Sequence, residues 1–247
     1  NLHMALKLMN YPGKQSCVIW SKRIAFLVSM FISRPGKHTI VLAVITLCLI
    51  GITYLHIPLD RDIFSSHNDV SLKITDRHGI VLREMLSAEG GRSTWLSYDE
   101  IPETVIQAVL SAEDKRFFSH GGVDWLAFGR AMIQNLAARR IVSGASTITQ
   151  QVIKNRFGLP RTVLGKVREM VLAIRLEHTL SKQKIFEQYI NRVEFSNLAF
   201  GIEAAANVYF RKPASHLSLA ESVFLAGLIQ APSRLNPYRD LDHAKQG

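Results

Sequence analysis

The chain has few cysteines. Among 247 residues there are two, Cys17 and Cys48, and none follows Cys48. The rest of the chain therefore cannot form an internal disulfide, and it must be stabilised by a packed core. Hydrophobic residues make up 47% of the sequence, which is enough for such a core and excludes global disorder.

Acidic residues are missing from the start of the chain, where the first one is Asp60. The same stretch carries six Lys or Arg residues, whereas the remainder carries 24 basic and 20 acidic residues, so the net charge of +10 divides into +6 and +4. A basic block beside an apolar run favours a membrane over a nucleic acid as the partner. We therefore expect no nucleic-acid partner.

Charged residues are also missing between Thr39 and Ile57. At about 1.5 Å per residue, a helix of this length spans roughly the 30 Å hydrocarbon core of a bilayer. We predict a basic cytoplasmic leader over 1–38 and a transmembrane anchor over 39–57, with the residues that follow outside the cytoplasm by the positive-inside rule. The alternatives are a buried core helix and a cleaved signal peptide.

After the anchor, period-two patterns predict a β-rich linker over 58–98. Helical patterns then continue through 99–247, broken by glycine and proline, without an internal repeat. The expected helices cover 102–117, 123–139, 145–157, 162–179, 182–192, 199–209 and 216–229.

A first polar cluster is the stretch SAEDKRFFSHGG at 111–122. The spacing of Glu113, Phe117 and His120 predicts that they share one helix face. A carboxylate beside aromatic rings has a raised pKa, which suits a general base. The alternative is an ordinary helix end with Glu113 in an ion pair.

A second cluster, GASTITQQVIKN at 144–155, places short uncharged polar side chains at a helix start. Its hydrogen-bonding members are Ser146, Thr147, Thr149, Gln150 and Gln151. They suit a sugar or a phosphate, because helix N-termini favour anions. The simpler alternative is helix capping by Ser146.

A third cluster brings cations close to one carboxylate. Lys154, Arg161, Lys166 and Arg168 lie near Glu169 in the sequence. They predict a cationic cradle for a diphosphate, with Glu169 available for a divalent ion. The alternative is a surface ion pair between Lys166 and Glu169 at i,i+3 spacing.

Taken together, these stretches resemble the ordered motifs of family 51 glycosyltransferases, the peptidoglycan polymerase domain. EDKRFFSHGG resembles E-D-x-x-F-x-x-H-x-G, and GASTITQQ matches G-x-S-T-I-T-Q-Q at every fixed position. GKVREM is similar to R-K-x-x-E, KIFEQYIN to K-x-x-I-L-x-x-Y-L-N, and ESVFLAGLIQAPSRLNPY to a last motif, A-x-L-A-G-L-x-Q-A-P.

The resemblance implies a mainly α fold, lysozyme-like and two-lobed, with the glycosyltransferase domain over 99–247. It implies polymerisation of lipid II into β-1,4-linked glycan by an inverting displacement, at the outer side of the bacterial cytoplasmic membrane. Glu113 and Glu169 are the implied catalytic residues, and Glu169 is the implied ligand of Mg²⁺ or Mn²⁺. The implied substrate-binding residues are Asp114, His120, Ser146, Thr147, Gln150, Gln151, Lys154, Arg161, Lys166 and Asn191. The expected partners are lipid II, the nascent lipid-linked strand, membrane lipids and other cell-wall synthesis proteins.

Two positions depart from the family pattern. Gly165 stands where the third motif has arginine, and Ser196 stands where a glycine is usual. The Gly165 variant looks most like the 1C group of class A penicillin-binding proteins. Ser181 begins an S-x-x-K match, but no S-D-N or K-T-G follows in these 247 residues, so we interpret it as a helix cap. A catalytically silent membrane scaffold and a glycan-cleaving enzyme of the same fold are the alternative functions.

Overall fold

The computed structural model describes residues 36–65, 71–78, 81–85, 92–140 and 144–230. The chain divides into two compact units, Asn1–Tyr54 and Leu55–Gly247. Helix α3 (Lys37–His56), most of which belongs to the first unit, contains a segment, His38–His56, with a mean hydropathy of 2.2. Among the described residues it is the one helix whose length and composition allow it to cross a membrane, and none of it is buried as a core helix would be.

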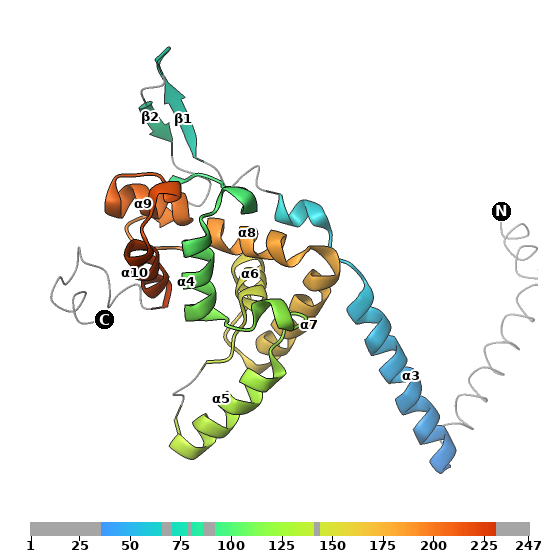
Figure 1. The fold of residues 1–247 in the computed structure, drawn as a ribbon. Coiled ribbons are helices and arrows are strands. Elements are labelled where there is room, and N and C mark those ends of the chain that lie inside the picture. Colours follow the sequence, from blue (N-terminus) through green and yellow to red (C-terminus); the bar gives the residue numbers. More distant parts are fainter. Residues whose placement is uncertain (1–35, 66–70, 79–80, 86–91, 141–143, 231–247) are drawn as a thin grey trace, which may run out of the picture. The chain divides into compact units, whose positions relative to one another are not determined.

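The second unit is mainly helical, as predicted (Figure 1). Its α-helices are α4 (Glu103–Glu113), α5 (Trp125–Ala138), α6 (Ile148–Phe157), α7 (Val163–Thr179), α8 (Lys182–Arg192), α9 (Ile202–Phe210) and α10 (Leu219–Gln230). Short 3-10 turns lie at η1 (Arg61–Phe64), η2 (Tyr98–Glu100), η3 (Phe117–Ser119) and η4 (Ala214–His216). The lysozyme-like, two-lobed arrangement stays a prediction.

Strands are few and short. Strand β1 (Leu72–Thr75) pairs antiparallel with β2 (Val81–Met85), within the region for which the sequence predicted strands. A second pair, parallel and two residues long, joins β3 (Arg92–Ser93) to β4 (Ala199–Phe200). This second pair ties the segment before α4 to the segment before α9.

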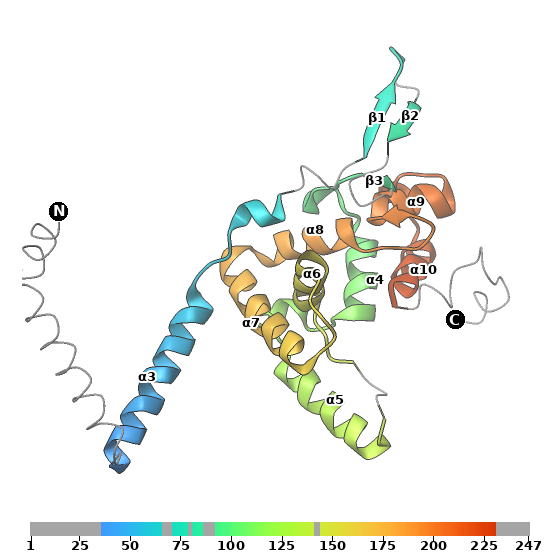
Figure 2. The same ribbon diagram turned by 180° about the vertical axis from the view of Figure 1, so that it is seen from behind.

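The core is built around α6 and α8. Helix α6 packs against α7 and α8, and α4 packs against α10 (Figures 1 and 2). Apolar residues at helical spacing supply the contact: Ile148, Val152 and Ile153 on α6 are buried, as are Phe186 and Ile190 on α8. Helix α5 extends away from this group in both views (Figures 1 and 2).

One predicted helix is wrong. The expected helix 102–117 ends at Glu113, because Asp114 leaves the helical conformation, with φ −156° and ψ 78°. Phe117 belongs to the separate turn η3, and His120 follows it. Glu113, Phe117 and His120 therefore do not share a face of one helix.

Both departures from the family pattern have a backbone explanation. A Cβ at Gly165 would lie 2.1 Å from the Pro160 carbonyl oxygen, so this close approach leaves no room for a side chain. Ser196, Asn197 and Leu198 have φ values of 70°, 53° and 60°. This left-handed conformation is costly for residues with a side chain, and it is the one that a glycine at 196 adopts freely.

We predict that Gly201→Ala destabilises the chain by about 3 kcal/mol, because a residue with a Cβ is strained at positive φ and crowds its neighbour. Gly201 has φ 81°, and an added Cβ would lie 2.7 Å from the Asn191 carbonyl oxygen. The matched control is Gly129→Ala inside α5, where nothing lies within 4 Å of the added Cβ. Thermal unfolding of the detergent-solubilised chain should show a lower midpoint for Gly201→Ala only; equal midpoints would contradict the packing described here.

Candidate active site

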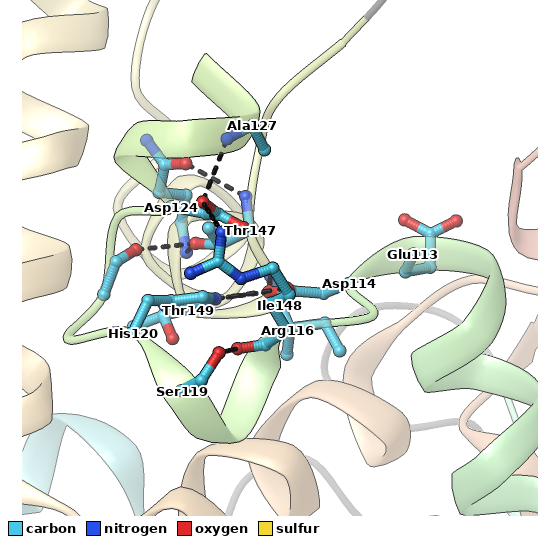
Figure 3. A network of polar contacts seen from close by, with 12 residues as sticks. Glu113, Asp114, Arg116, Ser119, His120, Asp124, Ala127, Thr147, Ile148 and Thr149 are labelled. Carbon is cyan, nitrogen blue, oxygen red and sulfur yellow. Dashed lines mark hydrogen bonds and ion pairs between the residues drawn. The ribbon is translucent and has the colours of Figure 1, made fainter. Parts of the chain in front are cut away.

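The turn after α4 is held by the carboxylate of Asp114. Its Oδ2 accepts hydrogen bonds from the Ile148 backbone N–H at 3.1 Å and from His120 Nε2 at 3.0 Å (Figure 3). Both side chains are almost fully buried. The Asp114–His120 pair therefore caps α6 and fixes the 114–120 turn on it. A contact of either residue with substrate stays a prediction.

The start of α6 uses two of its polar residues for its own structure. Thr147 Oγ1 accepts from the Gln150 N–H at 3.1 Å, and Gln150 Oε1 accepts from the Thr147 N–H at 2.9 Å, which is a capping box. Thr147 Oγ1 also donates to the Gly122 carbonyl at 2.7 Å. These contacts join the first two motifs. Thr147 and Gln150, predicted to bind substrate, therefore have structural roles in this fold.

Gln151, one position further on, contacts Glu113 instead. Its Nε2 donates to Glu113 Oε2 at 2.7 Å. The Glu113 carboxylate is half-buried and points away from the Asp114–His120 pair (Figure 3). Burial raises the pKa of Glu113, the Gln151 hydrogen bond partly offsets the rise, and the charge of Asp114 adds to it. A carboxylate with a raised pKa, oriented by an amide, suits proton abstraction near neutral pH.

Glu169 lies at the first turns of α7 with Lys166. The Lys166 Nζ donates to Glu169 Oε1 at 2.5 Å and to Ser146 Oγ at 2.8 Å. Glu169 is buried, while the Lys166 side chain is 38% exposed. Ser146, Lys166 and Glu169 therefore form one contiguous polar group that joins α7 to the loop before α6.

A pocket of about 630 Å³ is lined by Glu113, Asp114, Ser146 and Thr147 among the residues described above. Its walls are the end of α4, the following turn, one side of α5 and the loop at 144–147. The lining residues are Ser111, Ala112, Glu113, Asp114, Lys115, Arg116, Asp124, Ala127, Arg130, Gln134, Gly144, Ala145, Ser146 and Thr147. The pocket thus contains Glu113 and, through Ser146, borders Lys166.

Three cations of this pocket, Lys115, Arg116 and Arg130, were not predicted as site residues. Lys115 and Arg116 lie inside the first motif, directly after Glu113 and Asp114. Their place in the sequence could therefore have identified them as site residues. Arg130 lies three residues after Ala127 and four before Gln134, the spacing of one helix face. In the folded chain, this face of α5 and the 144–147 loop line the same pocket. The sequence alone does not show this proximity.

The predicted cation cradle is assembled in part. Lys166 meets Glu169, whereas Lys154 and Arg161 are exposed. Within the described ranges, no hydrogen bond or ion pair links Lys154 or Arg161 to Glu169. Their contact with a diphosphate stays a prediction.

Asn191 lies away from this pocket and is 1% exposed. Its Oδ1 accepts from the Leu96 N–H at 2.9 Å, and its Nδ2 donates to the carbonyls of Leu96 and Glu187, both at 2.8 Å. The amide is thereby fully engaged in holding the 94–98 segment on α8. The geometry gives no support to the prediction that Asn191 binds substrate.

The predicted metal site fits these side chains poorly. Among the described residues, no group of three or more His, Cys, Asp or Glu side chains converges. Glu169 is a single carboxylate, and its Oε1 already accepts from an ammonium group. Mg²⁺ and Mn²⁺ prefer several oxygen ligands. We therefore derive no catalytic step through a metal ion.

Glu113, whose pKa is raised, lines a pocket whose residue Ser146 contacts the Lys166–Glu169 pair, and this arrangement suits group transfer. Residues 78–247 match the family described as transglycosylase, and the chain belongs to this family. The family predicted from the motifs is therefore confirmed.

Two similar proteins are both named penicillin-binding protein 1A. The chain is 46% identical over 153 residues to penicillin-binding protein 1A of Aquifex aeolicus, covering 62% of this chain and 21% of that protein. It is 43% identical over 169 residues to penicillin-binding protein 1A of Pseudomonas aeruginosa, covering 68% of this chain and 20% of that protein. The chain thus spans about a fifth of the length of these relatives. Membership of the 1C group stays a prediction.

We predict that Gln151→Leu moves the acidic limb of the pH–rate profile to higher pH, because the carboxylate loses one hydrogen bond to its charged form. The Gln151 bond lowers the pKa of Glu113. Its loss raises that pKa, so a larger fraction of the base is protonated at a given pH and the rate recovers at higher pH.

Two variants complete this test. Gln107→Leu, on the exposed side of α4, removes an amide that contacts only Glu103 among the described hydrogen bonds, and it should leave the profile unchanged. Glu113→Gln should lose about 10²–10⁴-fold in rate at every pH. An acidic limb that stays in place in Gln151→Leu would show that Glu113 does not control it.

Proposed function

We propose that this chain is a peptidoglycan glycosyltransferase that polymerises lipid II into β-1,4-linked glycan strands and releases undecaprenyl diphosphate. The observation that carries the proposal is the pocket that contains Glu113 and borders Lys166. One side offers a proton acceptor, and the other offers a positive charge for a leaving diphosphate. Membership of the transglycosylase family supports the same activity.

Glu113 acts as the general base. The 4-hydroxyl of the acceptor sugar attacks the anomeric carbon of the lipid-linked donor strand, and Glu113 accepts the hydroxyl proton as the new bond forms. Gln151 keeps the carboxylate in place through the 2.7 Å hydrogen bond. A single displacement of an α-linked diphosphate gives the β product, so the reaction needs no covalent intermediate.

Lys166 stabilises the leaving diphosphate. An ammonium group has three N–H donors. In Lys166 two of them are directed to Ser146 and Glu169, which leaves the third for a phosphate oxygen. Fixed donors that face developing charge need no reorganisation during the reaction. Glu169 is thus a positioning residue that holds the ammonium, and this role requires no metal.

The substrate carries a lipid tail, and the exposed apolar residues of α5 suit contact with the outer leaflet. They are Trp125, Leu126, Phe128, Met132, Ile133 and Leu136. Together with α3 they support a bitopic protein of the bacterial cytoplasmic membrane, with the N-terminus inside and the catalytic domain outside. Membrane lipids, the nascent strand and other cell-wall synthesis proteins are the proposed partners.

A glycan-cleaving enzyme is less well supported. Hydrolases of this chemistry use a second carboxylic acid to protonate a poor leaving group. Here the second carboxylate, Glu169, accepts a hydrogen bond from Lys166 rather than facing a leaving group with a proton. Incubation with labelled lipid II separates the possibilities: a polymerase gives long glycan, a hydrolase gives cleavage of added glycan, and a silent scaffold gives neither.

We predict that Lys166→Ala lowers glycan synthesis by about 10²–10³-fold, the effect of removing one fixed donor from a developing negative charge. The control is Arg168→Ala, two residues along α7 and exposed, which should retain activity within severalfold because a solvated cation is worth about 0–1 kcal/mol. Lys154→Ala and Arg161→Ala belong in the same assay, since a diphosphate contact predicts losses of about 10²-fold. Equal rates for Lys166→Ala and Arg168→Ala would remove the leaving-group half of the mechanism.

The membrane topology predicts which thiols are accessible. His78 is exposed and follows β1, so we expect His78→Cys to react with a membrane-impermeant thiol reagent in intact spheroplasts. The unchanged chain is the control, because Cys17 in the basic leader should react only after lysis. Labelling of His78→Cys that also requires lysis would reverse the orientation.

A further inference from the structure

Helix α8 presents one face to the turn that follows α4. Lys182, Phe186 and Tyr189 lie at i, i+4 and i+7, a spacing that places them on the same side of the helix. The Lys182 Nζ lies 4.3 Å from the centroid of the Phe117 ring, and the centroid of the Phe186 ring lies 6.3 Å from it. Tyr189 continues this face of α8 by one turn.

The hydroxyl of Tyr189 is enclosed in the fold. The residue is 1% exposed, and in the described part of the chain its hydroxyl has no hydrogen-bond partner. Burial raises the pKa of Tyr189 well above its ordinary value, and the charges of Glu113 and Asp114 raise it further. The phenol therefore stays protonated at neutral pH and remains a hydrogen-bond donor near two carboxylates. A buried hydroxyl without a partner is costly, so this donor needs an acceptor.

The two carboxylates differ in how far their oxygens are engaged. Both oxygens of Asp114 contact His120, and Oδ2 also accepts from the Ile148 N–H. Glu113 accepts from Gln151 through Oε2. Among the hydrogen bonds of the described residues, Glu113 Oε1 has no donor. Glu113 is therefore the carboxylate with capacity for a further hydrogen bond.

We infer that Tyr189 is a positioning residue for the general base: its hydroxyl donates to one water molecule, and this water donates to the Glu113 carboxylate. The inference rests on the proposed function, in which Glu113 accepts the proton of the attacking hydroxyl. A bridging water is enthalpically nearly as good as a direct hydrogen bond, and buried waters join polar groups that otherwise lack partners. Gln151 thus holds the carboxylate from α6, and Tyr189 holds it from α8.

The other charged groups at this face of α8 are paired. Lys182 Nζ donates to Glu177 Oε1 at 2.7 Å, and His120 Nε2 lies 3.0 Å from Asp114 Oδ2. A competing acceptor for the Tyr189 hydroxyl is His120 Nδ1, which is buried and also lacks a partner among the described residues. Hydrogen bonds to an ionised acceptor are roughly twice as strong as those between neutral groups, which favours the carboxylate.

The test compares Tyr189→Phe with Tyr98→Phe, because both changes remove one hydroxyl and keep the ring. Tyr98 packs edge-on against Phe186 of the same helix at 6.1 Å, but the charges that act on it are those of Glu103 and Asp99.

Tyr189→Phe should lower kcat by roughly 3–10-fold on the acidic side of the pH–rate profile, with the KM for lipid II within about twofold, the effect of losing one hydrogen bond to a charged group. The acidic limb should move to higher pH, because the ionised form of Glu113 loses a donor. Tyr98→Phe should change neither kcat nor the limb. An unmoved limb in Tyr189→Phe, or an equal movement in Tyr98→Phe, overturns the positioning role.

A titration without turnover keeps this contact distinguishable from the proposed activity. The chain in detergent micelles, labelled with ¹³C at the glutamate carboxyl carbons, is titrated by NMR, and the Glu113 resonance is the one that Glu113→Gln lacks. The pKa of Glu113 should be higher in Tyr189→Phe than in the unchanged chain and the same in Tyr98→Phe. A higher pKa supports the contact even if the chain makes no glycan. An equal pKa, which is also the result if the hydroxyl serves His120, overturns it even if the chain does.

Thermal unfolding separates positioning from a purely structural role. Phenylalanine keeps the buried ring, so the midpoint of Tyr189→Phe should stay close to that of the unchanged chain. If Tyr189→Phe is unfolded at the assay temperature, the hydroxyl is needed for the fold itself, and the positioning role is overturned.

Discussion

The carboxylate of Asp114 is the contact on which the rest of the site depends. It stops α4 directly after Glu113, caps the first turn of α6 and holds His120. With α6 fixed in this way, Gln151 comes within 2.7 Å of Glu113. A buried carboxylate is stable only when its hydrogen bonds are satisfied, so this position tolerates few alternatives. The position of the Glu113 carboxylate therefore depends on the contacts of the neighbouring residue, Asp114.

Polar residues of the motifs divide into two groups by what they contact. Thr147, Gln150 and Asn191 bond to the backbone and hold loops on helices. Glu113 and Lys166 face or border the pocket. Both groups are equally polar in the sequence, and motif matching treats them alike. Only the hydrogen-bond partners show that Asn191, a motif residue, has a structural role like that of a buried leucine.

The sequence predicted the local elements well where capping and periodicity agree. The helix expected at 182–192 has the same bounds in the structure, and the one expected at 162–179 begins one residue later. The helix expected at 102–117 was wrong, because a long-range contact to Ile148, and not a local signal, ends it at Glu113. Arg130 was missed for a similar reason: its pocket exists only when α5 meets the 144–147 loop.

Position 165, where the resembled motif has arginine, is a glycine whose surroundings are crowded. The backbone there approaches the Pro160 carbonyl so closely that a Cβ would lie 2.1 Å from the oxygen. Any side chain at this position would have to separate the 160–165 turn, which begins the helix that carries Lys166. The glycine therefore allows the close contact that places the start of α7, and an arginine at this position is not compatible with that contact. The positive charge is then supplied by Lys166, which Ser146 and Glu169 hold from two sides.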